Sequence, residues 1–205
     1  MKRLLTILLA LFTLSIHAQT SKGSFMVGGD ASLNFNNGDS DNSTSSKSTS
    51  LILNPTAGYF FVNNFSAGLS IPFDVSWSTT KISSLPSEYD GNGHSLGIAP
   101  FVRYYIPVKS FFIITHAGYG WYSSKTSYEY IDVMTGAVIG TNEYKNKYRT
   151  LTLAAGPTFI LSPHTAIEIL ANYQRSTFSA DYSAFDQSKF YISVGFQIYL
   201  PSNKE

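Results

Sequence analysis

The segment from Asn64 to Ser78 alternates apolar and polar positions along its whole length. Phe65, Leu69 and Trp77 stand among its apolar residues, and the residues between them are mostly Ser, Gly and Asp. Because successive side chains of a strand point to opposite faces of a sheet, this period of two predicts a β-strand with one apolar face. Ordinary globular strands have about five or six residues. The longer stretch here favours a tilted strand that crosses a bilayer, which needs about 9 to 11 residues.

The same alternation recurs in other parts of the chain. It is found in the ranges Phe25–Phe35, Leu51–Phe61, Leu96–Ile106, Phe111–Tyr122, Leu151–Leu161, Thr165–Thr177 and Phe190–Leu200. With the opening segment these make eight predicted strands. The sequence therefore predicts an all-β fold, an eight-stranded antiparallel up-and-down transmembrane β-barrel.

The predicted connections fall into two classes that alternate in order. The short ones are residues 62–64, 107–110 and 162–164, and the long ones are residues 36–48, 78–93, 123–146 and 179–187. This pattern predicts short periplasmic turns and long extracellular loops, with both ends of the barrel in the periplasm. The first long loop is polar and low in complexity, so we expect it to be mobile. In the third, Thr135-Gly136 predicts a hairpin tip with strands that continue beyond the membrane.

Alternation alone does not say which face of a barrel meets solvent, because a soluble barrel turns its apolar face inward. Here the polar face is rich in Gly, Ser and Ala, which suit a crowded lumen better than a water-exposed surface. Charged residues make up 13% of the chain, compared with about 25% in soluble domains. Aromatic residues such as Trp77, Tyr104 and Trp121 end the apolar faces, as in the aromatic girdles of membrane barrels. The sequence therefore favours a membrane barrel over a soluble one.

The N-terminus places Lys2 and Arg3 before an apolar stretch that ends near Ile16. This profile predicts a secretory signal peptide over residues 1–18, with cleavage near Ala18, rather than a buried helix or an uncleaved anchor. The barrel would then occupy residues 19–200, with a short periplasmic tail at residues 201–205. Removal of Lys2 and Arg3 changes the formal net charge from +1 to −1. No affinity for nucleic acid follows from this balance.

Cysteine is absent from the chain. Its absence excludes disulfides, thiol catalysis and cysteine-bound metal. The four His residues are too scattered for a metal site, so we expect no metal and no cofactor.

The last strand ends in the sequence SVGFQIYL. With the other strands, it makes the chain resemble the small outer-membrane β-barrel proteins of Gram-negative bacteria, the OmpA-transmembrane and OmpX-like group. The resemblance implies an outer-membrane location, contact with lipid and lipopolysaccharide, and no peptidoglycan-binding domain here. It also implies a signal for the barrel-insertion machinery at Ser193, Gly195, Ile198 and Leu200, although the group commonly ends in an aromatic residue where this chain has Leu200.

Few ionisable side chains fall on the predicted lumen face. They are Asp30, Asp74, Arg103, His116 and Glu168. Buried charges persist when they are paired, and we expect Arg103 to pair with Glu168 or Asp30. Such a pair is either a structural element that fills a narrow interior or the gate of a narrow polar path.

Basic residues gather near the predicted outer ends of three adjacent strands. They are Lys145, Lys147, Arg149, Arg175 and Lys189. Charge-assisted hydrogen bonds from these groups could bind lipopolysaccharide phosphates. Arg149 and Arg175 share the parity of outward-facing residues, which places them at the level of lipid headgroups. The alternative is that all five are ordinary solvated charges at the rim.

Enzymes that modify lipid A share this architecture, and His94 has Ser95, Ser76 and Asp90 nearby along the predicted strands. Because Ser is frequent in this chain, such proximity is not specific, and we expect no catalysis. The sequence predicts a monomeric barrel with a structural or surface-interaction role through its extracellular loops, whose ligand it does not name. The alternatives are a narrow, porin-like channel for small solutes and a lipid A-modifying enzyme.

Overall fold

The computed structural model describes residues 20–40, 44–82, 87–108, 111–132, 134–179 and 184–202. The predicted signal peptide and its cleavage point lie outside these residues, as do positions 203–205 of the predicted tail. Within the described ranges, no helix has the length and hydropathy needed to cross a membrane.

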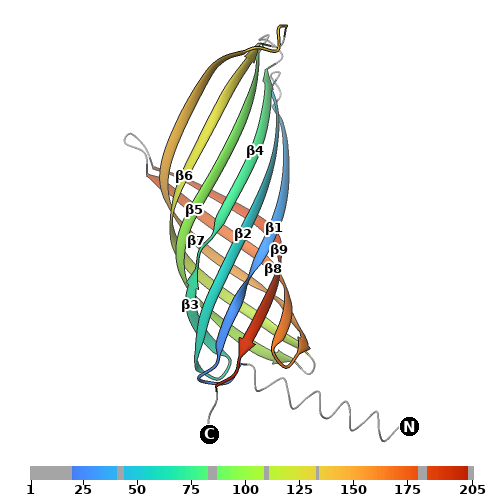
Figure 1. The fold of residues 1–205 in the computed structure, drawn as a ribbon, viewed down its shortest axis with the longest axis vertical. Helices are drawn as coiled ribbons and strands as arrows, with labels where there is room; N and C mark the ends of the chain where they lie inside the picture. The colour runs from blue at the N-terminus through green and yellow to red at the C-terminus, as the bar shows by residue number, and fades with distance from the viewer. Residues whose placement is uncertain are drawn as a thin grey trace, which may run out of the picture.

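The described chain is built from antiparallel strands that close into a ring (Figure 1). The strands are β1 (Phe25–Ser40), β2 (Thr44–Val62), β3 (Phe65–Ser70), β4 (Phe73–Ile82), β5 (Ser87–Val108), β6 (Phe111–Asp132), β7 (Val138–Ser162), β8 (Thr165–Ser179) and β9 (Ala184–Leu200). Strands that follow one another in the chain are paired, except that β3 and β4 each pair with β2 and β5 and not with each other, and β1 also pairs with β9. Because β3 and β4 occupy one place between β2 and β5, the ring has eight strands. The predicted fold is confirmed.

The strand predicted from Asn64 to Ser78 is interrupted in the structure. Its two parts, β3 and β4, are separated by Ile71 and Pro72. Proline has no N–H group to donate to the ladder, so regular pairing stops there. The register is nevertheless kept, because Ser70 lies opposite Thr56 and Phe73 lies opposite Leu53. The predicted strand is therefore wrong in being continuous, but each of its side chains still faces the predicted side of the sheet.

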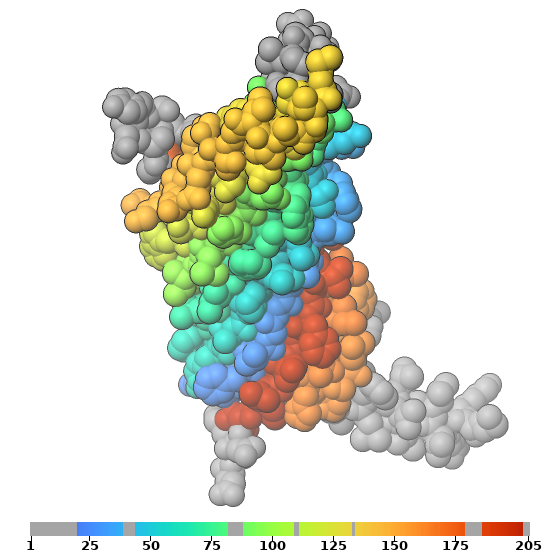
Figure 2. Space-filling view, turned by 45° about the horizontal axis from the view of Figure 1, so that its top comes forward, coloured from blue at the N-terminus to red at the C-terminus, as the bar shows by residue number. Residues whose placement is uncertain are grey.

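Most residues predicted as long loops are strand. β1 and β2 stay paired as far as Ser40 and Thr44, so the first loop is a hairpin along most of its length. The backbone groups of such polar segments are satisfied by pairing and need no apolar burial. The predicted continuation of β6 and β7 is confirmed, with Gly136 at a positive φ of 66° in their turn. In Figure 2 the upper part of the visible face is formed largely by these two strands, in yellow to orange.

The outer surface of the ring is apolar along the strands, and the inner surface is mostly polar. In β3, Leu69 is 52% exposed, whereas Ser66 and Ser70 are 0% and 3% exposed. Trp77 and Trp121 are about half exposed in the same way. A soluble barrel would show the opposite distribution. The predicted direction of the apolar face is therefore confirmed, and this face forms the belt that meets lipid.

The lower end of the lumen, where β1 begins and β9 ends, is filled by large side chains. Met26, Phe60, Tyr105, Phe112 and Tyr199 are each at most 1% exposed. The rings of Phe60 and Tyr105 lie 5.4 Å apart, and those of Phe60 and Tyr199 lie 6.2 Å apart. We call these five residues the aromatic plug. It closes the base of the barrel.

The residues that precede β1 cross the same end of the barrel. The backbone N–H of Gly23 donates to the carbonyl of Phe60 at 2.8 Å. The N–H of Asn64 donates to the carbonyl of Thr20, also at 2.8 Å, and the hydroxyl of Thr20 donates to Asn64 Oδ1 at 2.6 Å. The base is therefore tied to the β2–β3 turn as well as filled from inside.

Candidate functional site

An ion pair lies inside the barrel near the aromatic plug. Arg103 on β5 and Glu168 on β8 are joined by Nη1 and Oε2 at 3.1 Å, and neither side chain is exposed. Gln197 Nε2 on β9 donates to the same carboxylate oxygen at 3.3 Å, and Arg103 Nε donates to His116 Nδ1 at 3.1 Å. The pair therefore links β5 to β8 through the lumen. Of the two partners that the sequence analysis offers for Arg103, Glu168 and Asp30, Glu168 forms the direct ion pair.

Asp30 belongs to the same polar layer. Its Oδ2 accepts a hydrogen bond from Asn54 Nδ2 at 3.0 Å, and its charge interacts with that of Arg103. Four of the five predicted lumen residues are thus brought together. The fifth, Asp74, lies apart from them, where its charge interacts with that of Lys189.

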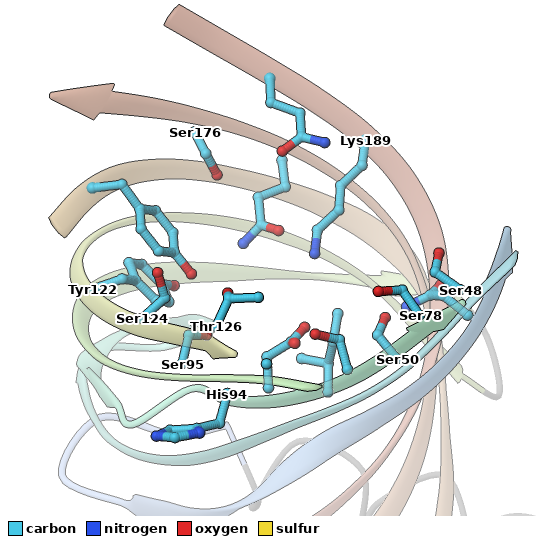
Figure 3. Close-up of a pocket in the computed structure, with 18 of the residues that line it drawn as sticks. Ser48, Ser50, Ser78, His94, Ser95, Tyr122, Ser124, Thr126, Ser176 and Lys189 are labelled. Atoms are coloured by element: carbon cyan, nitrogen blue, oxygen red, sulfur yellow. The ribbon is translucent and has the colours of Figure 1, made fainter. Parts of the chain in front are cut away.

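Away from this layer the lumen widens into a cavity of about 540 Å³, which we call the outer cavity. Figure 3 shows its polar wall, with serine and threonine side chains from several strands and Lys189 pointing into the space. The sequence analysis groups Lys189 with the outward-facing cations, but the structure places it on the inner face of β9. It shares the inward parity of Ser193 and Gly195 on β9, and it remains accessible to solvent because the cavity is wide.

The residues that the sequence analysis considers beside His94 do not all share its face of the sheet. Ser95 is buried on the inner face, whereas His94, the next residue on β5, is exposed on the outer face between Val75 and Lys125 (Figure 3). Asp90 shares the parity of His94 and accepts a hydrogen bond from the hydroxyl of Thr79 at 2.8 Å. A base on one face of a strand cannot deprotonate a hydroxyl on the other face. Among the described residues, no group of three or more His, Asp or Glu is placed to hold a metal ion.

A family model described as the outer membrane protein beta-barrel domain matches residues 4–197. The chain belongs to this family of outer-membrane barrels. The family places it in the bacterial outer membrane, as predicted. Comparison with curated protein sequences finds no match.

Three solved barrels illustrate the similarity in fold. A major outer membrane protein from Thermus thermophilus is 11% identical, with a TM-score of 0.50, and the match covers 87% of this chain and 99% of that one. Neisserial surface protein A is 16% identical, with a TM-score of 0.43 and coverage of 86% and 97%. The attachment invasion locus protein Ail of Yersinia pestis is 15% identical, with a TM-score of 0.43 and coverage of 87% and 99%.

The four other predicted basic residues lie on the outer face of this membrane barrel. Lys145 bonds to Glu143 at 3.4 Å, a carboxylate that Lys125 also contacts at 2.7 Å. Arg175 forms an ion pair with Asp186. Lys147 and Arg149 have no such carboxylate among the described residues, and Arg149 lies opposite Trp121 in the register. Of these four cations, two are therefore left without a counter-charge in the described part of the chain.

The predicted assembly signal lies on both faces of β9. Ser193 is buried and Gly195 faces the lumen, whereas Ile198 and Leu200 are 40% and 51% exposed on the lipid face. The apolar part of the pattern is thus on the surface of the barrel. Recognition by the insertion machinery stays a prediction.

The exposed pair Arg175–Asp186 gives a prediction for pH. The hydrogen bond from Arg175 lowers the pKa of the Asp186 carboxyl below its ordinary value of 3.8. The pair therefore stabilises the β8–β9 hairpin above pH 3.8, and this contribution is lost as the pH falls through the lowered pKa. We expect a carbon-13 NMR titration to place the Asp186 midpoint below 3.8. In Arg175→Gln the midpoint should move upward, and an unchanged midpoint would show that Arg175 has no such effect.

Proposed function

We propose that this protein is a non-conducting outer-membrane barrel that acts through its outer surface, either as a structural element or in surface interactions. The observation that carries the proposal is the closed base. The aromatic plug and the Arg103–Glu168 pair are almost free of exposed surface. An eight-stranded barrel is just wide enough for side chains to fill its interior. A filled base supports the structural reading of the ion pair over the gate.

Conductance in planar lipid bilayers tests this proposal. The wild-type barrel is expected to give no current steps above the baseline, because the plug side chains that fill the base are at most 1% exposed. As a positive control, the triple variant Phe60→Ala, Tyr105→Ala and Tyr199→Ala removes three plug side chains and should conduct if it remains folded. Heat-modifiable migration on a gel reports folding. Reproducible wild-type conductance would support the narrow channel instead.

The proposed role is also non-catalytic. His94 and Ser95 lie on opposite faces of β5, which leaves no nucleophile and base together at that position. Mass spectrometry of lipid A from cells that express the protein is expected to show no change. A mass shift that disappears in His94→Ala would contradict the proposal and support the lipid A-modifying enzyme.

A second candidate function is contact with lipopolysaccharide, and Lys147 and Arg149 favour it. Both lie on the outer face of β7, and Arg149 stands beside Trp121 at the end of the apolar belt. Phosphate groups could supply the missing counter-charge through charge-assisted hydrogen bonds. Lys125 and Lys145 already share Glu143 and have less need of one.

We expect the double variant Lys147→Gln and Arg149→Gln to reduce the lipopolysaccharide that co-purifies with the protein. The amount is measured as hydroxylated fatty acid per mole of barrel. The matched control is Lys125→Gln with Lys145→Gln, which removes the same charge from β6 and β7 but from residues already paired with Glu143. Equal loss in both variants would indicate a general charge effect, and no loss in either would remove the hypothesis.

A further inference from the structure

The seam that closes the ring is paired along only part of its length. β1 and β9 are in register from Phe25 opposite Leu200 to Ala31 opposite Val194. Beyond Ala31, β1 stays paired with β2, and before Val194, β9 stays paired with β8. The upper part of β1 and the outer part of β9 therefore diverge. We call the gap between them the seam notch.

Both edges of the seam notch border the outer cavity. Asn34 and Asn36 of β1 line the cavity, as do Gln187 and Lys189 of β9. The outward residues beside the notch are apolar, with Phe35, Phe190 and Ile192 respectively 69%, 81% and 68% exposed. Unpaired strand edges at membrane depth are tolerated when they line a water-filled cavity. At the notch, unpaired edges of β1 and β9 therefore stand between the polar cavity and the apolar outer face of the barrel.

The wall of the outer cavity is rich in hydroxyl and amide groups and poor in charge. Among the described lining residues, Asp74 and Lys189 are the charged ones, and their charges interact. A carboxylate accepts hydrogen bonds from hydroxyl groups and an ammonium group donates to them. This combination suits an uncharged ligand with many hydroxyl groups. The volume of about 540 Å³ falls in the ordinary range for small-molecule pockets of about 300–1,000 Å³.

One wall of the cavity carries a row of aromatic rings at the same level of three neighbouring strands. Tyr122 and Tyr148 are stacked with their centroids 5.1 Å apart, and Tyr148 and Phe178 are stacked at 4.7 Å. All three residues line the cavity. A sugar ring presents C–H groups on its faces and hydroxyl groups at its edge. It can therefore pack on such a row while it bonds to the polar wall.

We propose that the outer cavity binds the sugar headgroup of an amphiphile that enters from the outer leaflet through the seam notch, with its alkyl chain left against the apolar side chains beside the notch. The inference deepens the proposed surface role and rests on it. It is independent of the closed base, because conductance tests the plug whereas headgroup binding tests the cavity.

Native mass spectrometry tests the proposal on the folded barrel, kept in a polyoxyethylene detergent that carries no sugar. The probes are dodecyl maltoside, dodecyl phosphocholine with the same chain, and maltotriose without a chain. We expect a one-to-one adduct with the maltoside that survives detergent removal about tenfold better than either other adduct, which is about 1.4 kcal/mol. Equal retention of dodecyl phosphocholine would overturn the sugar preference. Equal retention of maltotriose would overturn entry through the notch.

Two adjacent residues provide the matched variants. Ser124 points into the cavity (Figure 3), and Ser123 is exposed on the opposite face of β6. Ser124→Trp should fill the cavity and abolish the maltoside adduct, whereas Ser123→Trp should keep it. If Ser124→Trp does not fold, Asp74→Asn serves instead and should weaken the adduct about tenfold. Wild-type retention in a folded Ser124→Trp, or in Asp74→Asn, would overturn the proposal.

Discussion

Glu168→Gln is expected to lower the free energy of unfolding by about 3–5 kcal/mol, the usual cost of breaking a buried ion pair at one partner. The amide keeps the size of the side chain and removes its charge. Arg103, whose side chain has no exposed surface, would then lose its closest counter-charge. Urea unfolding of the barrel from lipid vesicles measures the loss, followed by the fluorescence of Trp77 and Trp121, which lie on the lipid face.

Two further variants test whether the lost stability comes from the unpaired buried charge of Arg103 or simply from the removal of a carboxylate in the lumen. Asp74→Asn also removes a carboxylate from the lumen, but in the wide outer cavity, where its partner Lys189 is accessible to solvent. We expect a cost below about 1 kcal/mol. The double variant Arg103→Met and Glu168→Met should recover much of the stability, because paired replacement by apolar residues leaves no buried charge. Glu168→Gln with wild-type stability would show that the pair does not hold the base closed.

Gly156→Ala is expected to cost about 1–3 kcal/mol, the range typical of overpacking. A Cβ atom at Gly156 would lie 1.9 Å from the backbone oxygen of Ile169 on β8. Backbone atoms cannot give way as a flexible side chain would, so the two strands would have to separate. The same urea titration measures the effect, together with the yield of refolded, heat-modifiable protein.

Gly140→Ala is the control for this substitution. It lies on the same strand, and a Cβ atom there would meet no atom closer than 3.7 Å. We expect its stability to stay within about 0.5 kcal/mol of the wild type. A Gly156→Ala variant as stable as Gly140→Ala would show that β7 and β8 can move apart at little cost.

Parity along each strand accounts for most of what the sequence predicted correctly. It placed Arg103, His116 and Glu168 inside and Trp77 outside, because one face of a membrane barrel must be apolar. The same parity places Lys189 inward with Gly195, so its prediction as an outer lipopolysaccharide contact is wrong in the face of the strand. Lys189 has the height of the other four cations along the barrel, but height does not determine which face of the strand carries a side chain.

Other features of the fold could not be predicted from the alternation of apolar and polar residues. Tyr105 and Tyr199 share the parity of Arg103 and Gln197, but their apolar rings gave no sign that they close the base. The polar stretch between β1 and β2 has the composition of a mobile loop, yet backbone pairing extends it as a hairpin. Backbone hydrogen bonds between strands form whether or not the side chains alternate between apolar and polar residues. For the same reason, the length of the β1–β9 seam could not be derived from the side chains.

The seam also determines when this barrel can close. Phe25 pairs with Leu200, which lies 175 positions later in the chain. Contacts between such distant residues form slowly, because the ordering entropy of the whole chain must be overcome before they add stability. Until β9 is present, the free edge of β1 has no partner within the chain. Ring closure is therefore the final step of assembly, and a chain that ends before β9 would remain an open sheet with two unpaired edges.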